Sequence, residues 1–254
     1  MDEIIGSKFT CNVCGGFSVF SPQGDWREAA SCTNCASSVR SRQMAYLVSM
    51  FTTNAPEILP RVYRHDLTGV GLSDSEFLAS QLSKSFNYTN TYYHTEPMLD
   101  ICNPSEEWIE RADFLVSSDV FEHVPAPVSS AFAGTYRVLK AGGVLILTVP
   151  FDGRSQTTEH YPNVRQFAVT NVAKEWLLVG KTSSDSFEVH RDLVFHGGPG
   201  TTVEMRFFSE ADLIGELRDA GFVSIQIHNE PFAPFGIYPP HNQGLPITAI
   251  KPHQ

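Results

Sequence analysis

The sequence predicts an α/β fold with a parallel sheet, and three observations in its middle part carry that prediction. Residues 114–117 are a short apolar run of the kind found in fully buried parallel strands. Residues 128–139 repeat apolar side chains at helical spacing, and residues 144–149 are a second buried run, closed by Pro150. Gly142 and Gly143 are predicted to end the helix in a left-handed cap. Strand, helix and strand in this order form a right-handed crossover between parallel strands.

Composition limits the class of protein. The chain has 254 residues, enough for one large α/β domain and a small appendage. Its net charge is −10, which disfavours a non-specific grip on nucleic acid phosphates. No apolar run approaches the ~20 residues of a membrane span, and the first residues have no signal-peptide character. We therefore expect a cytoplasmic protein without a membrane partner.

Four of the five cysteines are spaced as metal ligands. Cys11 and Cys14 form one C-x2-C pair, and Cys32 and Cys35 form another. Two such knuckles can close four thiolates around Zn²⁺. The pattern predicts a zinc ribbon over residues 1–45, with residues 17–20 as one of its strands, and a closed site of this kind is structural. A redox dithiol pair or exposed thiols are the alternatives.

A helix is predicted directly after the ribbon, through Met44, Leu47 and Phe51. Arg40 and Arg42 lie at its start. They could contact a phosphorylated or nucleic acid substrate, or they could simply form a solvated helix start.

Residues 61–71 are predicted to be the first strand of the sheet and the turn that follows it. Ser73 and Glu76 have the spacing of a capping box, so a helix should start just after Gly71. A glycine turn that leads into a helix N-terminus lets a nucleotide approach the backbone. Only Gly69 and Gly71 are present, however, and a rival register makes residues 69–75 the second strand.

The motif SSDVFEHVP, followed by YRVLKAGGVLILTVPF, resembles the fourth and fifth strands of class I S-adenosylmethionine-dependent methyltransferases of the type 11-like group. The resemblance implies a Rossmann-like sheet over residues 46–254, with S-adenosylmethionine bound at the carboxyl ends of the strands. The alternative is an ordinary βαβ unit whose carboxylates cap its helix.

The resemblance also implies a set of cofactor-binding residues. Residues 88–93 correspond to the second strand and residues 98–101 to the third, and each is followed or ended by an acidic side chain. Glu96 could equally be an exposed loop residue, and Asp100 could cap a turn. The implied cofactor-binding residues are Gly69, Gly71, Ser73, Glu96, Asp100, Ile101, Ser117, Ser118 and Asp119.

Asp119, Glu122 and His123 stand together on one turn. Two carboxylates and an imidazole could hold Mg²⁺, as a similar pattern does in some small-molecule O-methyltransferases of this class. The same residues could instead cap the helix and orient a substrate.

Residues 152–208 are too long for a simple connection, so we expect an inserted substrate-side cap. Residues 193–195 and 202–205 should form a hairpin inside it. A neutral histidine suits the removal of a proton from an acceptor hydroxyl. His123, His160 and His196 are the candidates for this catalytic base, although each could be structural.

The end of the chain should complete the sheet. Residues 209–221 are predicted to form a helix that Ser209 caps and Gly221 ends. Residues 223–227 and 245–250 should be the last two strands, which form an antiparallel hairpin at the sheet edge in the class I family.

The function we expect is methyl transfer from S-adenosylmethionine to a hydroxyl of a small molecule or saccharide. One alternative is an RNA base methyltransferase that binds its substrate with the zinc ribbon. A second is a non-catalytic scaffold with a degenerate methyltransferase fold, which the incomplete glycine turn motivates. The sequence does not indicate an oligomeric state.

Overall fold

The computed structural model describes residues 4–21, 32–239 and 244–253. Its centre is a six-stranded sheet in the order β15-β16-β6-β5-β3-β4. The four strands from β4 to β6 are parallel, whereas β16 is antiparallel to both β6 and β15. The strands of this sheet are β3 (Arg64–Leu72), β4 (Phe86–Thr91), β5 (Ala112–Ser118), β6 (Leu139–Thr148), β15 (Val223–Ile227) and β16 (Ile247–Ile250).

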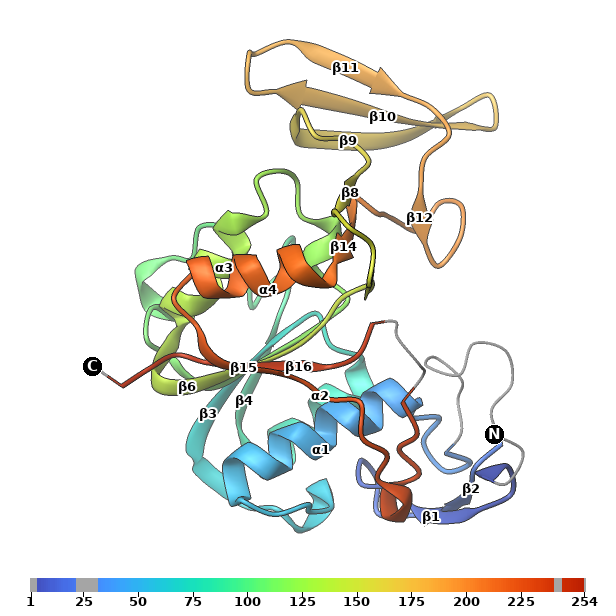
Figure 1. The fold of residues 1–254 in the computed structure, drawn as a ribbon, viewed down its shortest axis with the longest axis vertical. Helices are drawn as coiled ribbons and strands as arrows, with labels where there is room; N and C mark the ends of the chain where they lie inside the picture. Colours follow the sequence, from blue (N-terminus) through green and yellow to red (C-terminus); the bar gives the residue numbers. More distant parts are fainter. Residues whose placement is uncertain (1–3, 22–31, 240–243, 254) are drawn as a thin grey trace.

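Helices cover both faces of the sheet, with α3 and α4 on one face and α1 and α2 on the other (Figure 1). The α-helices are α1 (Val39–Thr53), α2 (Glu76–Ser85), α3 (Ser129–Val138) and α4 (Glu210–Asp219). Short 3-10 helices are η2 (Leu59–Arg61), η3 (Glu106–Trp108), η4 (Phe121–His123) and η5 (Ala233–Phe235). This three-layer arrangement confirms the predicted α/β class.

The alternation of side chains along β5 and β6 divides the interior into two cores. Leu115 and Leu145 pack with α3 and α4, whereas Phe114 and Ile146 pack with α1 and α2. Successive side chains of a strand point to opposite faces, so strands buried on both sides read as continuous apolar runs. The two apolar runs in the sequence therefore correctly predicted both strands.

The predicted last helix and last strands are confirmed. The side chain of Ser209 accepts a hydrogen bond from the backbone N–H of Asp212, and Gly221 adopts a φ of 101° after the helix. The antiparallel pair β15–β16 follows. Hairpin β12–β13 also confirms the predicted hairpin around residues 195–203.

Three local predictions are wrong. Gly142 and Gly143 do not cap α3, because this helix ends at Val138 and β6 starts at the next residue. The predicted third strand is reduced to an isolated bridge between Tyr92 and Met98. Ser73 does not cap α2, which begins at Glu76.

The ribbon hairpin consists of β1 (Lys8–Thr10) and β2 (Phe17–Val19), which confirms the predicted strand. Its buried residues belong to the same core as α1, α2 and one face of the sheet. Arg42 of α1 is fully buried, and its guanidinium donates to the carbonyls of Phe235 and Gly236 at 2.9 and 2.7 Å. The predicted domain boundary at residue 45 falls inside α1.

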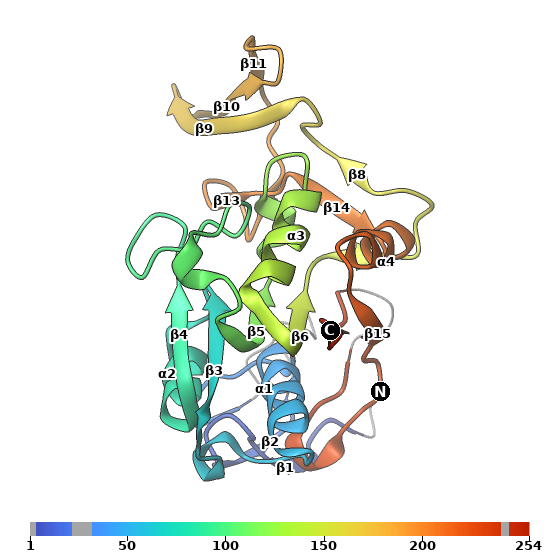
Figure 2. The same cartoon turned by 90° about the vertical axis from the view of Figure 1, so that its left-hand side faces the viewer.

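The insertion between β6 and α4 has its own strands. They are β7 (Phe151–Asp152), β8 (Thr158–Glu159), β9 (Val164–Val172), β10 (Glu175–Thr182), β11 (Phe187–His190), β12 (Phe195–His196), β13 (Thr202–Val203) and β14 (Arg206–Ser209). The antiparallel sheet β11-β10-β9 projects from one end of the molecule, and the ribbon lies at the other (Figures 1 and 2).

Candidate functional site

The four ribbon cysteines form a compact cluster. Their sulfur atoms all lie within 4.8 Å of one another, and none is in a disulfide. The Sγ atoms of Cys11 and Cys35 are 3.8 Å apart, and those of Cys14 and Cys32 are 3.7 Å apart. A tetrahedron with metal–sulfur bonds of about 2.3 Å has edges of about 3.8 Å. The cluster therefore has the dimensions of a four-thiolate zinc site.

The chemistry of the cluster also fits a cation. The hydrogen bond to Cys35 and burial raise the pKa of Cys11 to about 12, and burial raises the pKa of Cys14 to about 11. Thiols this close together cannot all ionise unless a cation stabilises the thiolates. The geometry and the donor set are thus consistent with a zinc ribbon.

A second cluster occupies the carboxyl ends of β3 and β5, which are neighbours in the sheet. Leu72 pairs with Ser117 at this end of the two strands. Asp119 follows β5 with a φ of 54°, and its Oδ2 lies 2.9 Å from Nη1 of Arg40. Arg40 also donates to the hydroxyl of Ser118. A cation from the start of α1 therefore lies where open α/β sheets bind their ligands.

Gly69 and Gly71 lie inside β3, so the prediction that they form a turn is wrong. Their lack of a side chain makes room for neighbours. A Cβ at Gly69 would collide with the rings of Phe114 and Tyr88, and one at Gly71 with the Tyr88 hydroxyl and the Asp74 carboxylate. Their predicted contact with the cofactor stays a prediction.

Asp74, in the turn after β3, is a buried carboxylate that the sequence reasoning missed. Its Oδ2 accepts a hydrogen bond from the hydroxyl of Tyr88, and burial raises its pKa to about 7. Among the residues that the structure describes, Oδ1 of Asp74 has no hydrogen-bond donor. Its position directly after the G-x-G strand was the available signal.

Glu122 is the most unusual group in this part of the molecule. It is fully buried, and neither of its oxygens accepts a hydrogen bond in the described part of the chain. Nδ1 of His196, from the insertion, lies 3.3 Å from its Oε1, and Nε2 of His123 lies 3.6 Å from the same atom. Nε2 of His196 lies 3.7 Å from Asp119. The insertion therefore delivers a histidine to the end of β5.

The pKa values of two groups in this cluster are raised. Burial raises the pKa of Glu122, and the close contact with the Glu122 carboxylate raises the pKa of His196 above its ordinary value of 6.5. Nδ1 of His123 lies 2.7 Å from the carbonyl of Val203, so that nitrogen carries the hydrogen and Nε2 faces Glu122. Both raised pKa values favour the protonated forms of Glu122 and His196.

Arg206 of β14 holds the turn that carries these groups. This arginine is fully buried, and its Nη1 donates to the carbonyls of Phe121 and Val124 at 2.8 and 2.6 Å. Its Nε lies 2.7 Å from Glu159. The backbone N–H of Met205 donates to the carbonyl of Glu122 at 2.7 Å. The insertion thus braces the turn as well as supplying His196.

Three of the other predicted site residues have a polar partner close by, and two are buried. Glu96 is exposed and accepts from the N–H of Met98, while Asp100 accepts from the N–H of Cys102, as a turn cap does. Nε2 of His160 lies 3.1 Å from Glu204. Ile101 and Ser117 are buried. The roles of these residues in binding or catalysis stay predictions.

The predicted Mg²⁺ ligands were Asp119, Glu122 and His123. The group whose ligand atoms could converge on one ion consists instead of Glu122, His123 and His196. Two imidazole nitrogens suit a transition metal, whereas Mg²⁺ prefers oxygen ligands. The donor set therefore does not favour magnesium.

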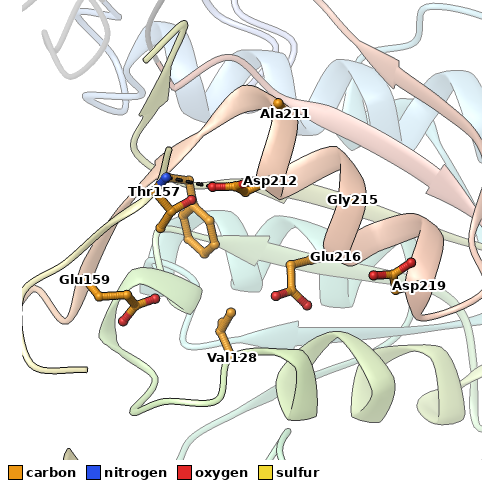
Figure 3. A pocket seen from close by; sticks show the side chains of 9 residues that line it. Val128, Thr157, Glu159, Ala211, Asp212, Gly215, Glu216 and Asp219 are labelled. Atoms are coloured by element: carbon orange, nitrogen blue, oxygen red, sulfur yellow. Dashed lines mark hydrogen bonds between the residues drawn. The ribbon is translucent and has the colours of Figure 1, made fainter. Parts of the chain in front are cut away.

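Two cavities lie apart from this cluster. One has a volume of about 310 Å³ and is lined by α4 and the start of the insertion, where Glu159, Asp212, Glu216 and Asp219 make it acidic (Figure 3). The other, of about 300 Å³, lies between α1 and residues 226–237. Of the helices that the structure describes, none is both long and apolar enough to span a membrane.

A family model matches part of the chain. Residues 52–147 match the family model described as "Methyltransferase domain". No curated protein matches the chain.

Among solved structures, the chain is similar to the citrinin polyketide synthase CMeT domain, with 11% identity over 85% of this chain and 52% of that one and a TM-score of 0.46. It is similar to phosphoethanolamine N-methyltransferase 2 of Haemonchus contortus, with 13% identity over 84% and 52% and a TM-score of 0.45. It is also similar to the glycopeptide N-methyltransferase MtfA, with 14% identity over 79% and 94% and a TM-score of 0.45. The chain spans about half the length of the first two structures. Identities and TM-scores this low transfer neither an activity nor a substrate.

The sheet, with its antiparallel edge and its polar cluster at the carboxyl ends of β3 and β5, has the Rossmann-like arrangement that the sequence predicted. The match to a methyltransferase-domain model over residues 52–147 agrees with the resemblance to class I S-adenosylmethionine-dependent methyltransferases that the sequence predicted. The match extends from the end of α1 to β6.

Proposed function

We propose that this protein transfers the methyl group of S-adenosylmethionine to a hydroxyl of a small molecule or saccharide, with His196 as the base. The observation that carries the proposal is the buried, unsatisfied Glu122 carboxylate beside Nδ1 of His196. The acidic chain and the polar insertion suit a compact, uncharged or cationic acceptor.

Glu122 sets the tautomer of the base. A hydrogen on Nδ1 of His196 is directed to Oε1 of Glu122 at 3.3 Å, which leaves the lone pair on Nε2. Nε2 is the nitrogen that faces Asp119, next to the end of β5. It can therefore accept a proton on the side where the cofactor is expected.

The reaction is an in-line displacement. The acceptor oxygen forms a bond to the methyl carbon, the carbon–sulfur bond breaks with its electron pair going to sulfur, and the hydroxyl proton moves to Nε2 of His196. The buried carboxylate of Glu122 stabilises the imidazolium that results. The sulfonium supplies the reactivity, and the protein supplies proximity and a base.

The test is cofactor titration followed by a screen of hydroxylated acceptors. With an acceptor in hand, His196→Asn and Glu122→Gln should each lower kcat by roughly 10²- to 10⁴-fold. His65→Asn is the matched control, because His65 is exposed and lies on β3 away from this edge. Activity should be lost as pH falls through the raised pKa of His196, because the protonated imidazole cannot act as a base. Unchanged kcat in His196→Asn would remove the base from the proposal.

The RNA alternative was motivated by Arg40 and Arg42. Arg42 is fully buried, and Arg40 points to Ser118 and Asp119, so neither contributes to a basic surface. The net charge of −10 gives no further support to a phosphate-binding face. We therefore retain the small-molecule or saccharide acceptor.

We also propose that Cys11, Cys14, Cys32 and Cys35 bind one Zn²⁺ that has a structural role. Metal analysis of the purified chain should give one zinc per molecule, and Cys14→Ser should reduce it. Cys102→Ser is the matched control, because Cys102 is half-buried outside the cluster. Loss of zinc in the control variant would contradict the assignment.

A further inference from the structure

The turn Phe121–His123 is held in place by a short segment of the insertion. The backbone N–H of Met205 donates to the carbonyl of Glu122 at 2.7 Å, and Nδ1 of His123 lies 2.7 Å from the carbonyl of Val203. The turn itself is a single turn of 3-10 helix, whose internal hydrogen bonds have poor geometry. The insertion therefore supplies hydrogen bonds that the turn cannot make within itself.

Arg206 is the next residue of this segment, and its guanidinium reaches both ends of the turn. Its side chain is 0% exposed, and Nη1 donates to the carbonyls of Phe121 and Val124 at 2.8 and 2.6 Å. Glu159 is the residue opposite Arg206 in the pairing of β8 with β14, and its two oxygens accept from Nε and Nη2 at 2.7 and 3.2 Å. One guanidinium thus joins the turn to two strands of the insertion.

The stability of the fold does not by itself account for a buried charge at this position. Removing a guanidinium from water is costly, and its partner Glu159 is 31% exposed, so water weakens the ion pair. Apolar side chains of similar volume can often replace a buried ion pair without loss of stability. An apolar side chain cannot fix two backbone carbonyls, however, whereas a guanidinium does so with donors of set geometry.

We propose that Arg206 is a positioning residue for methyl transfer, because it holds the turn so that the Glu122 carboxylate meets Nδ1 of His196. Arg206 bonds to the backbone on either side of Glu122 and not to its carboxylate. His196 and Arg206 belong to the same insertion, so docking of this one segment brings the histidine and orders the carboxylate beside it. The inference rests on the proposed function, in which His196 is the base.

The kinetic test uses the metal-loaded full chain. Arg206→Met removes a buried donor from two carbonyls of the turn, so Glu122 should shift. The value of kcat should fall by roughly 10- to 100-fold, while KM for the acceptor should change by less than ~3-fold. Arg154→Met is the matched control and should leave kcat unchanged, because the side-chain hydrogen bonds of Arg154 stay within the insertion, with Asp152 and Thr158.

A second variant, Arg206→Lys, separates positioning from folding because it keeps the positive charge. An ammonium group is a point donor rather than a planar fork, so kcat should fall by roughly 3- to 10-fold with KM unchanged. A kcat equal to that of the unmodified chain in both variants would overturn the proposal, and so would a loss that appears in KM alone.

A spectroscopic readout tests the same role without an acceptor. In the chain with isotope-labelled histidine, the imidazole N–H of His123 is sheltered by the carbonyl of Val203, and His123→Asn identifies its signal. In Arg206→Met this hydrogen should exchange with water at least ~10-fold faster, whereas in Arg154→Met its rate should not change.

The two readouts distinguish the possible failures. An unchanged exchange rate in Arg206→Met would mean that the turn keeps its place without the guanidinium, which would overturn the positioning role while the proposed function stands. If the exchange rate rises but the unmodified chain neither binds S-adenosylmethionine nor methylates a hydroxylated acceptor, the proposed function fails, and the assignment of Arg206 to the reaction fails with it.

Discussion

The ribbon and the insertion are both additions to the sheet, but they are attached in different ways. The ribbon shares its core with α1, α2 and three strands of the sheet. The insertion has a small core of its own around Tyr161, Leu178 and Met205. Its outer strands expose large apolar side chains, with Phe187 70% exposed and Val189 60% exposed.

Each addition nevertheless delivers one side chain to the same edge. Arg40 comes from the ribbon side and His196 from the insertion, and both approach Asp119. Arg40 lies in the same helical turn as the buried Arg42, which does not titrate near neutral pH. His196 instead contacts Glu122, and both of these groups titrate. The ribbon is therefore part of the folded core, whereas the contact that the insertion makes through His196 depends on pH.

Of the changes that test this comparison, removal of the metal should have the largest effect on stability. Because the ribbon shares a core with the sheet, a chelator should lower the unfolding temperature of the whole domain by ~10 °C or more. Calorimetry before and after chelation measures the shift, and re-addition of Zn²⁺ is the control. If the sheet melted at its original temperature while only residues 4–21 and 32–37 became protease-sensitive, the ribbon would be an independent unit.

The second-largest effect on stability should come from replacing Arg42, the buried residue that holds the ribbon side of the molecule to residues 235–236. Arg42→Met leaves the carbonyls of Ser37, Phe235 and Gly236 without their donors, so the free energy of unfolding should fall by roughly 3 kcal/mol or more. Urea denaturation measures this change. The matched variant in the insertion is Arg191→Met, whose ion pair with Glu175 is exposed and should contribute about 0–1 kcal/mol. Equal losses in the two variants would remove the contrast between the regions.

Much of the fold could be predicted because its signals are local. The apolar runs of β5 and β6, the Ser209 cap and Gly221 end of α4, and the spacing of the cysteines all depend on neighbours in the sequence. The misplaced glycines show the limit of this reasoning. Gly69 and Gly71 are needed for close contact with Tyr88 and Phe114, which are brought near only by strand pairing.

The site was less predictable for the same reason. Asp119, Glu122 and His123 stand in one recognisable motif, but the approach of Arg40 depends on how α1 packs against the sheet. The burial of Asp74 depends on the Tyr88 hydroxyl from the neighbouring strand. The choice of His196 over His160 depends on the path of the whole insertion, for which the sequence has no local signal.

A rise in pH should loosen the insertion but not the ribbon. The close contact with Glu122 raises the pKa of His196, so the stability that this contact contributes is complete below pH 6.5 and is lost as pH rises through the raised pKa. Burial raises the pKa of Glu122, which acts in the same direction.

Hydrogen exchange measures this effect. After correction for intrinsic rates, exchange of residues 195–203 should be roughly two- to tenfold faster at pH 9 than at pH 6, whereas exchange in α1 should not change. The variant His196→Asn should lose the dependence. A pH-independent rate in the unmodified chain would mean that the hairpin is held by its backbone contacts alone.

The smallest effect on stability is expected from a substitution in the projecting sheet β11-β10-β9. Phe187 lies on β11 and is 70% exposed, so Phe187→Ala removes little buried area and should change the free energy of unfolding by less than ~0.5 kcal/mol. Phe20 follows the ribbon hairpin and is 0% exposed, so Phe20→Ala should cost roughly 3–5 kcal/mol. Urea denaturation of the two variants compares one chemical change at the two ends of the molecule. A loss above ~1.5 kcal/mol in Phe187→Ala would contradict this expectation. Because Phe187 buries little area within the chain, a loss of that size would mean that the sheet β9–β11 unfolds together with the rest of the molecule, or that Phe187 contacts another molecule.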